Sequence, residues 1–407
     1  MPEAVIVSAV RSPIGRARKG SLTGMRPDDL AAQLVRAALD QVPALDAAEI
    51  EDLILGCGLP GGEQGFNLAR SVAVLLGLDN VPGTTVTRYC ASSLQGTRMA
   101  LHAIRAGEGD VFIAAGVEAI SRLGLGSSDS LPYTCNPRFA EAARRTAVAE
   151  AGADGWTDPR ETGRLPDVYI AAGQTAENLA QVRGITRREM DQFGVRSQNL
   201  AEDAIKTGFF EAEITPVTLP NGTVVATDDS PRPGISYDDV AQLDPIFRAE
   251  GLVTAGNCGP LSDGAAALVI MSDTRARALG VTPLARIVST AVTALSPEIM
   301  GLGPVEASRQ ALRRAGMTAS DVDLVELNEA FAAQVIPSAR DLGIDPFGDQ
   351  LNVHGGAIAL GHPYGMTGAR ITTTLLHGLA ARDKSIGLES MCVGGGQGMA
   401  IIFERLS

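Results

Sequence analysis

Two short stretches of this 407-residue chain share a pattern that decides its fold class. The first reads EIEDLIL at residues 49–55, and the second reads DVDLVEL at residues 321–327. Each follows a helical stretch, carries an acidic turn and runs into an apolar, strand-like segment. A looser match joins AVIV at 4–7 with ARIV at 285–288. Two such matches also arise by chance in α/β chains, but together they favour an α/β protein built from two similar halves.

The middle of the chain has a different character. Residues 122–250 are rich in charged residues, glycine and proline, and DDSPRPG at 228–234 is typical of them. A helical stretch, 187–205, interrupts this region, and strand-like character returns at 266–271. We therefore expect an insertion here and not a third copy of the repeated unit.

Composition limits the possible functions. The formal charge of −13 argues against non-specific nucleic-acid binding, and it means that local arginines must hold any phosphorylated substrate. No apolar run approaches the roughly 18 residues of a membrane span. The cysteines are odd in number and irregularly spaced, and no signal peptide precedes them, so we expect free thiols in the reducing cytoplasm. They lie at positions 57, 90, 135, 258 and 392.

The first candidate for chemistry is Cys90. Residues 84–87 predict a short buried strand, and a helix is expected from about 91 to 106, so Cys90 lies where the strand turns into the helix. The backbone N–H groups and the helix dipole at that point favour a thiolate, which is the nucleophilic form of cysteine. The alternative is a small core residue, which is the commoner role of a lone cysteine.

A second cysteine lies in the glycine-rich stretch ESMCVGGGQG, residues 389–398. Glycines allow backbone N–H groups to approach a ligand closely, so Gly394–Gly396 could donate hydrogen bonds to an oxyanion beside Cys392. The alternative is a glycine hairpin with a buried cysteine.

Histidine is scarce, and one stretch contains two of the four. Residues 352–370 read NVHGGAIALGHPYGMTGAR, with polar residues set in an apolar, glycine-rich loop. His362 precedes a proline on a rigid turn and is a candidate base or oxyanion donor. His354 is its rival. His102 and His377 fall on helical stretches without polar companions, so we expect structural or surface roles for them.

A polar pair follows the strand-like segment 324–327, in the sequence NEAFA at 328–332. The carboxyl end of a buried strand is where α/β folds place active-site groups. The alternative for Asn328 is a helix N-cap. No zinc spacing, phosphate-binding loop, dinucleotide fingerprint or esterase elbow is evident, so we expect two thiols and a histidine to act without a metal.

Together these segments resemble the thiolase family, in the family's order along the chain. The resembling blocks, of which the last two are the specific ones, are 86–95, 115–121, 173–178, 253–267, 328–332, 355–370 and 392–398. The resemblance implies duplicated halves stacked as five layers, αβαβα, with an inserted loop domain. The implied boundaries are 1–121 with 251–282 for the N-terminal half, 122–250 for a loop domain that contacts coenzyme A and other subunits, and 283–407 for the C-terminal half.

The resemblance also implies residue roles. Cys90 matches the acylated nucleophile, and Cys392 matches the cysteine that acts as acid and base on the α-carbon. His362 matches the histidine that activates the nucleophile and helps to hold a thioester oxygen. Asn328 matches the asparagine that fixes a water in the same oxyanion hole. The backbone N–H groups of Cys90 and Gly394 would form a second hole.

Contacts to coenzyme A are implied for Arg232, Gly259 and Phe331, with Arg232 near the nucleotide end. Gly259 stands where many members have a serine, so one pantetheine contact is in doubt. His354 replaces the family's usual asparagine. Ala171–Ala172 replace a bulkier pair, and this predicts tolerance of acyl chains longer than acetoacetyl.

The implied activity is thiolysis of a 3-ketoacyl-CoA to acetyl-CoA and a shortened acyl-CoA, or the reverse Claisen condensation, in fatty acid metabolism and β-oxidation. Coenzyme A and acetyl-CoA are substrates, with no permanently bound cofactor, and we expect a homodimer or homotetramer. One alternative is a dedicated acetyl-CoA acetyltransferase that forms acetoacetyl-CoA. A related condensing enzyme is disfavoured by Cys392, and a catalytically silent binding subunit is disfavoured because all four catalytic residue types are present.

Overall fold

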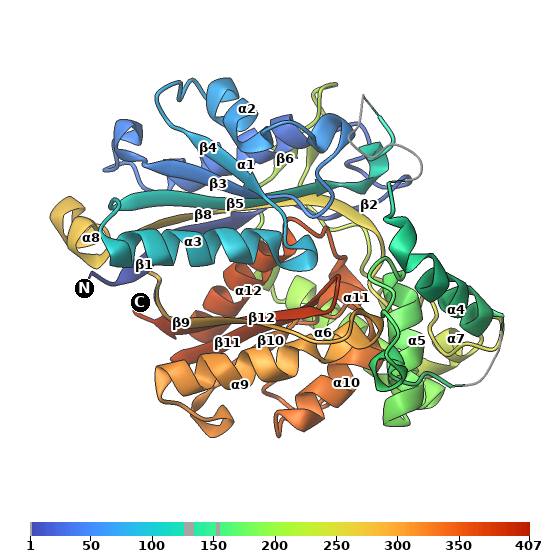
Figure 1. Cartoon of the computed structure of the whole chain (residues 1–407). Coiled ribbons are helices and arrows are strands. Elements are labelled where there is room, and N and C mark those ends of the chain that lie inside the picture. The colour runs from blue at the N-terminus through green and yellow to red at the C-terminus, as the bar shows by residue number, and fades with distance from the viewer. Residues whose placement is uncertain (1, 126–133, 152–154) are drawn as a thin grey trace.

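Five alternating layers of helices and strands make up the molecule, as Figure 1 shows. The computed structural model describes residues 2–125, 134–151 and 155–407. One outer face is covered by α1 (Pro27–Asp40) and α2 (Leu68–Leu75). The middle layer is formed by α3 (Ser92–Ala106) and α12 (Thr367–Ala381). The other outer face is covered by α9 (Gly303–Ala315) and α10 (Ala332–Asp341). The expected αβαβα layering is confirmed.

The strands between the helical layers repeat one topology. The first set runs β4-β3-β5-β8-β1, and the second runs β10-β11-β12-β9, with an isolated parallel bridge from Val325 to Leu351 in place of the outermost strand. Among the described residues, the two sets join only where β1 meets β9, through two residue pairs. The bounds are β1 Ala4–Arg11, β3 Asp52–Gly56, β4 Gly83–Val86, β5 Val111–Ala119, β8 Ser262–Ser272, β9 Ala285–Ala294, β10 Leu324–Leu327, β11 Ile386–Val393 and β12 Gln397–Arg405, with β2 (Gly15–Arg16) beside β8.

The repeat seen in the sequence corresponds to β3 and β10, each preceded by a short 3-10 turn, η1 (Ala47–Glu49) and η9 (Ala319–Asp321). Strands such as β5 and β8 are buried along their whole length, because helices cover both faces of each sheet. The strand expected at 84–87 differs from its prediction. It forms β4, which is half-buried, because it lies at the end of the sheet and, within the described part of the chain, pairs with β3 alone.

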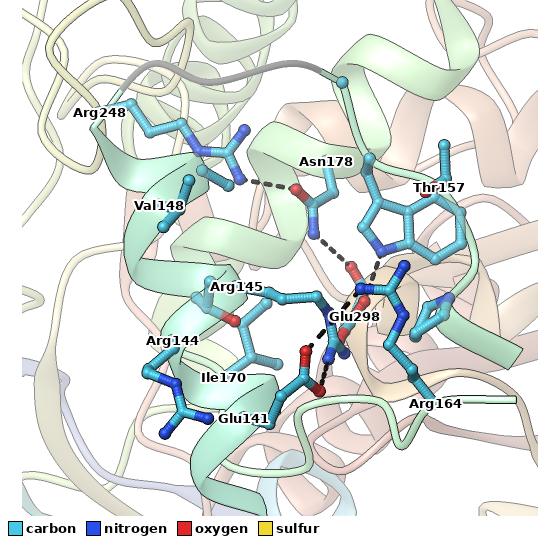
Figure 2. Close-up of a pocket in the computed structure, with 15 residues that line it drawn as sticks. Glu141, Arg144, Arg145, Val148, Thr157, Arg164, Ile170, Asn178, Arg248 and Glu298 are labelled. Carbon is cyan, nitrogen blue, oxygen red and sulfur yellow. Dashed lines mark hydrogen bonds and ion pairs between the residues drawn. The ribbon is translucent and has the colours of Figure 1, made fainter. Parts of the chain in front are cut away.

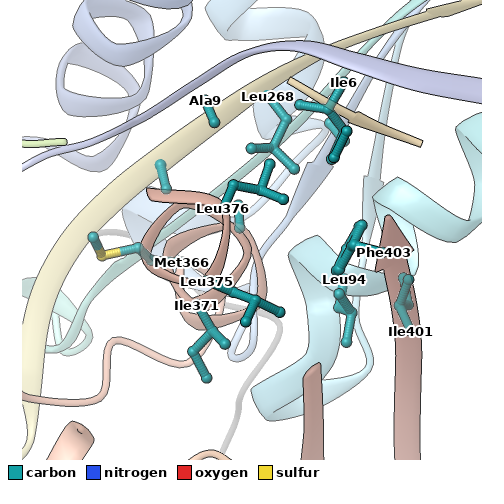
Figure 3. Packing of buried hydrophobic residues seen from close by; sticks show 14 of the residues in the cluster. Ile6, Ala9, Leu94, Leu268, Met366, Ile371, Leu375, Leu376, Ile401 and Phe403 are labelled. Atoms are coloured by element: carbon teal, nitrogen blue, oxygen red, sulfur yellow. The ribbon is translucent and has the colours of Figure 1, made fainter. Parts of the chain in front are cut away.

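The middle helix α12 is fixed between the two sheets. Figure 3 shows its apolar residues between Ile6 and Leu268 of the first sheet and Phe403 of the second. Leu375 and Leu376 of α12 are 1% and 5% exposed, and burying a leucine side chain stabilises a fold by about 1.5–3 kcal/mol. This packing holds the start of α12 in place, and the candidate site lies there.

Between β5 and β8 the chain forms a largely helical region at one side of the layers, on the right of Figure 1. The helix expected at 187–205 is confirmed as α6 (Arg187–Lys206). The domain boundaries at 122–250 stay a prediction. The region's other elements are α4 (Ala140–Glu150), α5 (Ala172–Arg183), α7 (Tyr237–Ala241), β6 (Val217–Thr218) and β7 (Val224–Val225). Within the described ranges, no helix has the length and apolarity that crossing a bilayer requires.

Candidate functional site

Cys90 lies in a single 3-10 turn, η3 (Tyr89–Ala91), between β4 and α3. The preceding residue, Tyr89, has φ of +44°, a conformation that costs a non-glycine residue about 1–3 kcal/mol. The Ser92 hydroxyl donates to the Tyr89 carbonyl over 2.6 Å, and it accepts from the Arg88 N–H over 2.9 Å. The strained turn is therefore held by the first residue of α3, and Cys90 keeps 9% of its surface exposed.

The electrostatics of Cys90 differ from the sequence-based expectation. Burial raises the pKa of its thiol to about 12, although the backbone N–H groups of Gly394 and of Cys90 itself act in the opposite direction. Desolvation of the charged form therefore outweighs the favourable backbone dipoles. The thiol is neutral at neutral pH and needs a base.

His362 is 5% exposed, and its protonation can be read from its partners. Thr367 Oγ1 donates its only proton to the Pro363 carbonyl over 2.7 Å, so it must accept a hydrogen bond from His362 Nδ1, 2.7 Å away. The proton therefore resides on Nδ1, and Nε2 is left as an acceptor. Burial, assisted by the Arg370 guanidinium, lowers the pKa of His362 to about 3. The ring is a neutral base. Sequence reasoning missed Thr367, the residue that orients it.

Asn328 faces this imidazole. Its Nδ2 lies 3.2 Å from His362 Nε2 and donates to it, and its Oδ1 is buried without a hydrogen-bond partner among the described residues. The N–H of Asn328 bonds the Ser390 carbonyl of β11 over 3.0 Å, which ties the end of β10 to the strand that carries Cys392. The N-cap alternative is wrong, because α10 begins after Phe331 and has no side-chain cap.

Cys392 lies near the end of β11 with no exposed surface. Burial raises the pKa of its thiol, and the neighbouring Cys90 adds to the shift. The following turn reverses the chain into β12, with φ of +74° at Gly395 and +79° at Gly396. A Cβ at Gly394 would lie 3.1 Å from the Tyr89 ring. The glycine turn thus packs directly against the segment that carries Cys90.

A buried carboxylate, Glu118 at the end of β5, fastens the histidine loop to the first half. It accepts hydrogen bonds from the backbone N–H groups of Gly58 at 2.7 Å, Gly365 at 2.8 Å and Leu59 at 3.2 Å, and from Gln64 Nε2 at 2.8 Å. Burial still raises the pKa of Glu118. Sequence reasoning missed it, although a polar residue at the end of a buried strand was the signal that identified Asn328.

The residues expected to contact coenzyme A fall in two places. Gly259 adjoins the site, since a Cβ there would lie 3.6 Å from His362 Cβ. Phe331 is 8% exposed and meets Phe247 edge-on, with ring centroids 6.0 Å apart. Arg232 is exposed on the loop before α7, and its backbone N–H bonds Gln198 on α6. Its side chain makes no described contact with the two cysteines, His362 or Asn328.

The rival histidine lies elsewhere. The His354 ring stacks on Phe209, with centroids 3.6 Å apart and planes at 10°, and Gly378 of α12 lies beside it. It makes no described contact with either cysteine. Among residues 2–125, 134–151 and 155–407, no group of three or more His, Cys, Asp or Glu side chains is arranged to hold a metal ion.

Comparison with known proteins gives a consistent result. The model of the thiolase N-terminal domain matches residues 4–274, and the model of the thiolase C-terminal domain matches residues 281–405. A 3-ketoacyl-CoA thiolase of Serratia proteamaculans is 43% identical, with 100% of each chain covered. A β-ketoadipyl-CoA thiolase of Escherichia coli is 42% identical, also with full coverage. A solved structure of the Bacillus anthracis acetyl-CoA acetyltransferase is similar, with a TM-score of 0.87, 37% identity, and coverage of 100% of this chain and 99% of that one.

Proposed function

Because this chain belongs to the thiolase family of acyltransferases, we propose that Cys90, His362, Asn328 and Cys392 form its catalytic centre. The proposed reaction is CoA-dependent cleavage of a 3-ketoacyl-CoA, with the reverse condensation as its microscopic counterpart. The observation that carries the proposal is the protonation of His362: with the proton on Nδ1, the unprotonated Nε2, which accepts from Asn328, is a ready proton acceptor at a site that also contains two thiols.

In the first step, Cys90 Sγ attacks the keto carbon of the substrate while His362 Nε2 takes the thiol proton. The backbone N–H groups of Cys90 and Gly394 hold the oxyanion that forms. The carbon–carbon bond then breaks, leaving an acyl group on Cys90 and an enolate of acetyl-CoA. The protonated His362, with Asn328, stabilises the enolate oxygen. Cys392 gives its proton to the enolate carbon, and acetyl-CoA leaves.

In the second step, the Cys392 thiolate takes the proton of an incoming coenzyme A thiol. The resulting thiolate attacks the acyl group on Cys90, and Sγ leaves with the proton held by His362. The products are the shortened acyl-CoA and a restored enzyme. Losing one oxyanion donor in such a scheme typically costs about 2.7–4 kcal/mol of barrier.

For the acyl group we propose chains longer than acetoacetyl. Ala171 and Ala172, at the start of α5, are both exposed, and several relatives are named 3-ketoacyl-CoA thiolases. Replacing Ala172 with methionine should depress kcat/KM for six- and eight-carbon substrates by about 10–100-fold and spare acetoacetyl-CoA. A wild-type enzyme already inactive beyond four carbons would favour the second candidate, an acetyl-CoA acetyltransferase like the B. anthracis structural neighbour.

We also propose that the enzyme works as a homodimer or homotetramer in the cytoplasm, within fatty acid β-oxidation. The open edge of β4 and the 92% exposed Phe66 support self-association, since such edges and apolar side chains are commonly covered by a partner. Sedimentation velocity of wild type and Phe66→Ser would test the assembly. A wild-type monomer would contradict it.

The decisive test of the activity is thiolysis of acetoacetyl-CoA, followed by the absorbance of its magnesium enolate. Acetyl mass should map to Cys90 after incubation with acetoacetyl-CoA alone. An acetyl group on Cys57, Cys135 or Cys258, with Cys90 unmodified, would contradict the mechanism.

A further inference from the structure

A cavity of about 530 Å³ lies between α4, α5 and the 3-10 turn η8 (Pro297–Leu302). Its lining contains four arginines (144, 145, 164 and 248) and two glutamates (141 and 298), together with apolar walls such as Trp156 and Ile170. The lining is therefore positively charged, although the whole chain carries −13. A concave, partly apolar cavity with a few charged groups is typical of a ligand site.

Two of the arginines are neutralised within the cavity. Figure 2 shows Arg145 and Arg164 directed toward Glu141 and Glu298. Arg145 forms ion pairs with both glutamates, and Arg164 lies 3.8 Å from Glu141. Glu298 also accepts a hydrogen bond from Trp156 Nε1 over 2.6 Å. Both carboxylates are thus occupied by groups of the protein.

Arg248 is held differently. At the other end of the cavity, beside Asn178 in Figure 2, its Nη2 donates to Asn178 Oδ1 over 2.6 Å and its Nε donates to Gln174 Oε1 over 2.7 Å. Both acceptors are neutral, and no carboxylate lies within ion-pair distance among the described residues. Burial lowers the pKa of Arg248, and the carboxylates of Glu177 and Glu150 offset this only in part. Its Nη1 makes no hydrogen bond in the part of the chain that the structure describes.

Two connections join this cavity to the catalytic residues. Phe247, the neighbour of Arg248, meets Phe331 edge-on, and Phe331 lies three residues beyond Asn328. On the other side, Glu298 follows Pro297, whose backbone N lies 2.6 Å from where a Cβ of Gly396 would be. Residues adjacent in sequence to two lining residues, Arg248 and Glu298, therefore contact the segment after Asn328 and the glycine turn.

We propose that this cavity receives the far end of the acyl chain and that Arg248 selects a chain that ends in a carboxylate. The proposal rests on the proposed thiolase function and specifies its substrate class. A guanidinium oriented by two amide oxygens is well placed to bind a carboxylate, while Ile170 and Val148 offer apolar contact to the methylenes before it.

The test compares two six-carbon substrates, 3-ketoadipyl-CoA and 3-ketohexanoyl-CoA, which differ only in a terminal carboxylate or methyl group. Wild type should prefer 3-ketoadipyl-CoA in kcat/KM. Arg248→Met should lower its kcat/KM by about 10–100-fold, the usual effect of losing a hydrogen bond to a charged group. The same variant should change 3-ketohexanoyl-CoA by less than about threefold.

The matched control is Arg277→Met, which removes a charge from α8 at the opposite side of the molecule in Figure 1 and should affect both substrates equally. Equal losses on both substrates in Arg248→Met would show that Arg248 only positions α5, and this would overturn the proposal. So would a wild type that cleaves 3-ketohexanoyl-CoA at least as well as 3-ketoadipyl-CoA. Absence of activity on every 3-ketoacyl-CoA would instead contradict the proposed function itself.

Free adipate distinguishes a tethered carboxylate from a separate acid ligand. At millimolar concentration it should inhibit 3-ketoadipyl-CoA cleavage competitively in wild type and not in Arg248→Met. Activation by adipate, with no preference between the two thioesters, would assign the cavity to a free acid and overturn the proposal.

Discussion

The two halves of the molecule place different groups at the same position of equivalent strands. β5 and β11 each pair in parallel with the repeated strand of their own half, and those pairings end at Gly116 and Ser390. Two residues further along lie Glu118 and Cys392. Glu118 accepts hydrogen bonds from three backbone N–H groups and from Gln64, and so fastens loops together, whereas Cys392 is a buried thiol in the proposed catalytic centre.

At the two middle helices the proposed reactive group is in the first half and the scaffolding group is in the second. In the first half, the turn before α3 carries the proposed nucleophile, Cys90, and in the second half the first residue of α12 is Thr367, which orients His362. At these two pairs of positions, each half thus has one scaffolding group and one proposed reactive group, and their places are exchanged between the halves. A duplicated fold therefore fixes where polar groups can lie and leaves open which of them react.

The largest expected effect concerns the two cysteines. Cys90→Ala should lose both acylation and thiolysis, because no nucleophile remains. Cys392→Ala should still accept an acyl group at Cys90 from an acyl-CoA, since that transfer moves no α-carbon proton, but should lose about three powers of ten or more in carbon–carbon cleavage. Mass mapping and the thiolysis assay separate the two functions. Near-wild-type thiolysis by Cys392→Ala would contradict the acid/base role proposed for Cys392.

Next in size is the contrast between the two histidines. His362→Asn removes the base and an oxyanion donor, so kcat should fall by about 10³–10⁵-fold. His354→Asn only replaces a ring that stacks on Phe209, and kcat should stay within about threefold. Steady-state kinetics on acetoacetyl-CoA measures both. Similar losses in the two variants would mean that the position of the imidazole has been misassigned.

Replacing Glu118 should destabilise the protein more than replacing Cys392. Glu118→Gln turns an amide NH₂ toward backbone donors, leaving about two buried donors unsatisfied at roughly 1–3 kcal/mol each. The free energy of unfolding should fall by roughly 2–6 kcal/mol in denaturant titrations, while Cys392→Ala should unfold within about 1.5 kcal/mol of wild type. If Glu118→Gln retains full stability, its scaffolding role is wrong.

The smallest effect concerns ionisation. With the pKa of Cys90 near 12 and that of His362 near 3, the thiolate fraction grows tenfold for each pH unit between 7 and 10. Iodoacetamide should therefore alkylate Cys90 about tenfold faster per unit, without a plateau. Peptide mass spectrometry follows it, with the exposed Cys135 as internal reference. A plateau near pH 8 would instead support the sequence-based prediction that the start of α3 stabilises Cys90 as a thiolate.

Much of the fold could be predicted from the sequence because it depends on local pattern. The helix expected at 187–205 and the duplicated strands followed from apolar periodicity and acidic turns. β4 was predicted as buried and is half-buried, because the sequence of a strand does not say whether it ends a sheet. The thiolate expected at Cys90 failed for a related reason: the helix start was visible in the sequence, but the depth of burial was not.

The site's orienting groups were harder to find. Thr367 matters because the first turn of α12 brings its hydroxyl to His362 Nδ1, and spacing alone does not reveal that geometry. Arg248 depends on amide oxygens of α5 that are 70 and 74 residues away in sequence. Asn328 and His362 lie on different segments, and only the fold brings their side chains to 3.2 Å.

The order of the proposed catalytic groups along the chain has a consequence for the protein's synthesis. Cys90 leaves the ribosome early, but His362 and Cys392 belong to the last segments made, and Gly368 of α12 must still seat against the backbone of Leu94 on α3. Until that contact forms, the thiol has no base and no oxyanion donor from the second half. Under the proposed mechanism, a nascent chain that still lacks the second half is therefore inactive toward cellular thioesters.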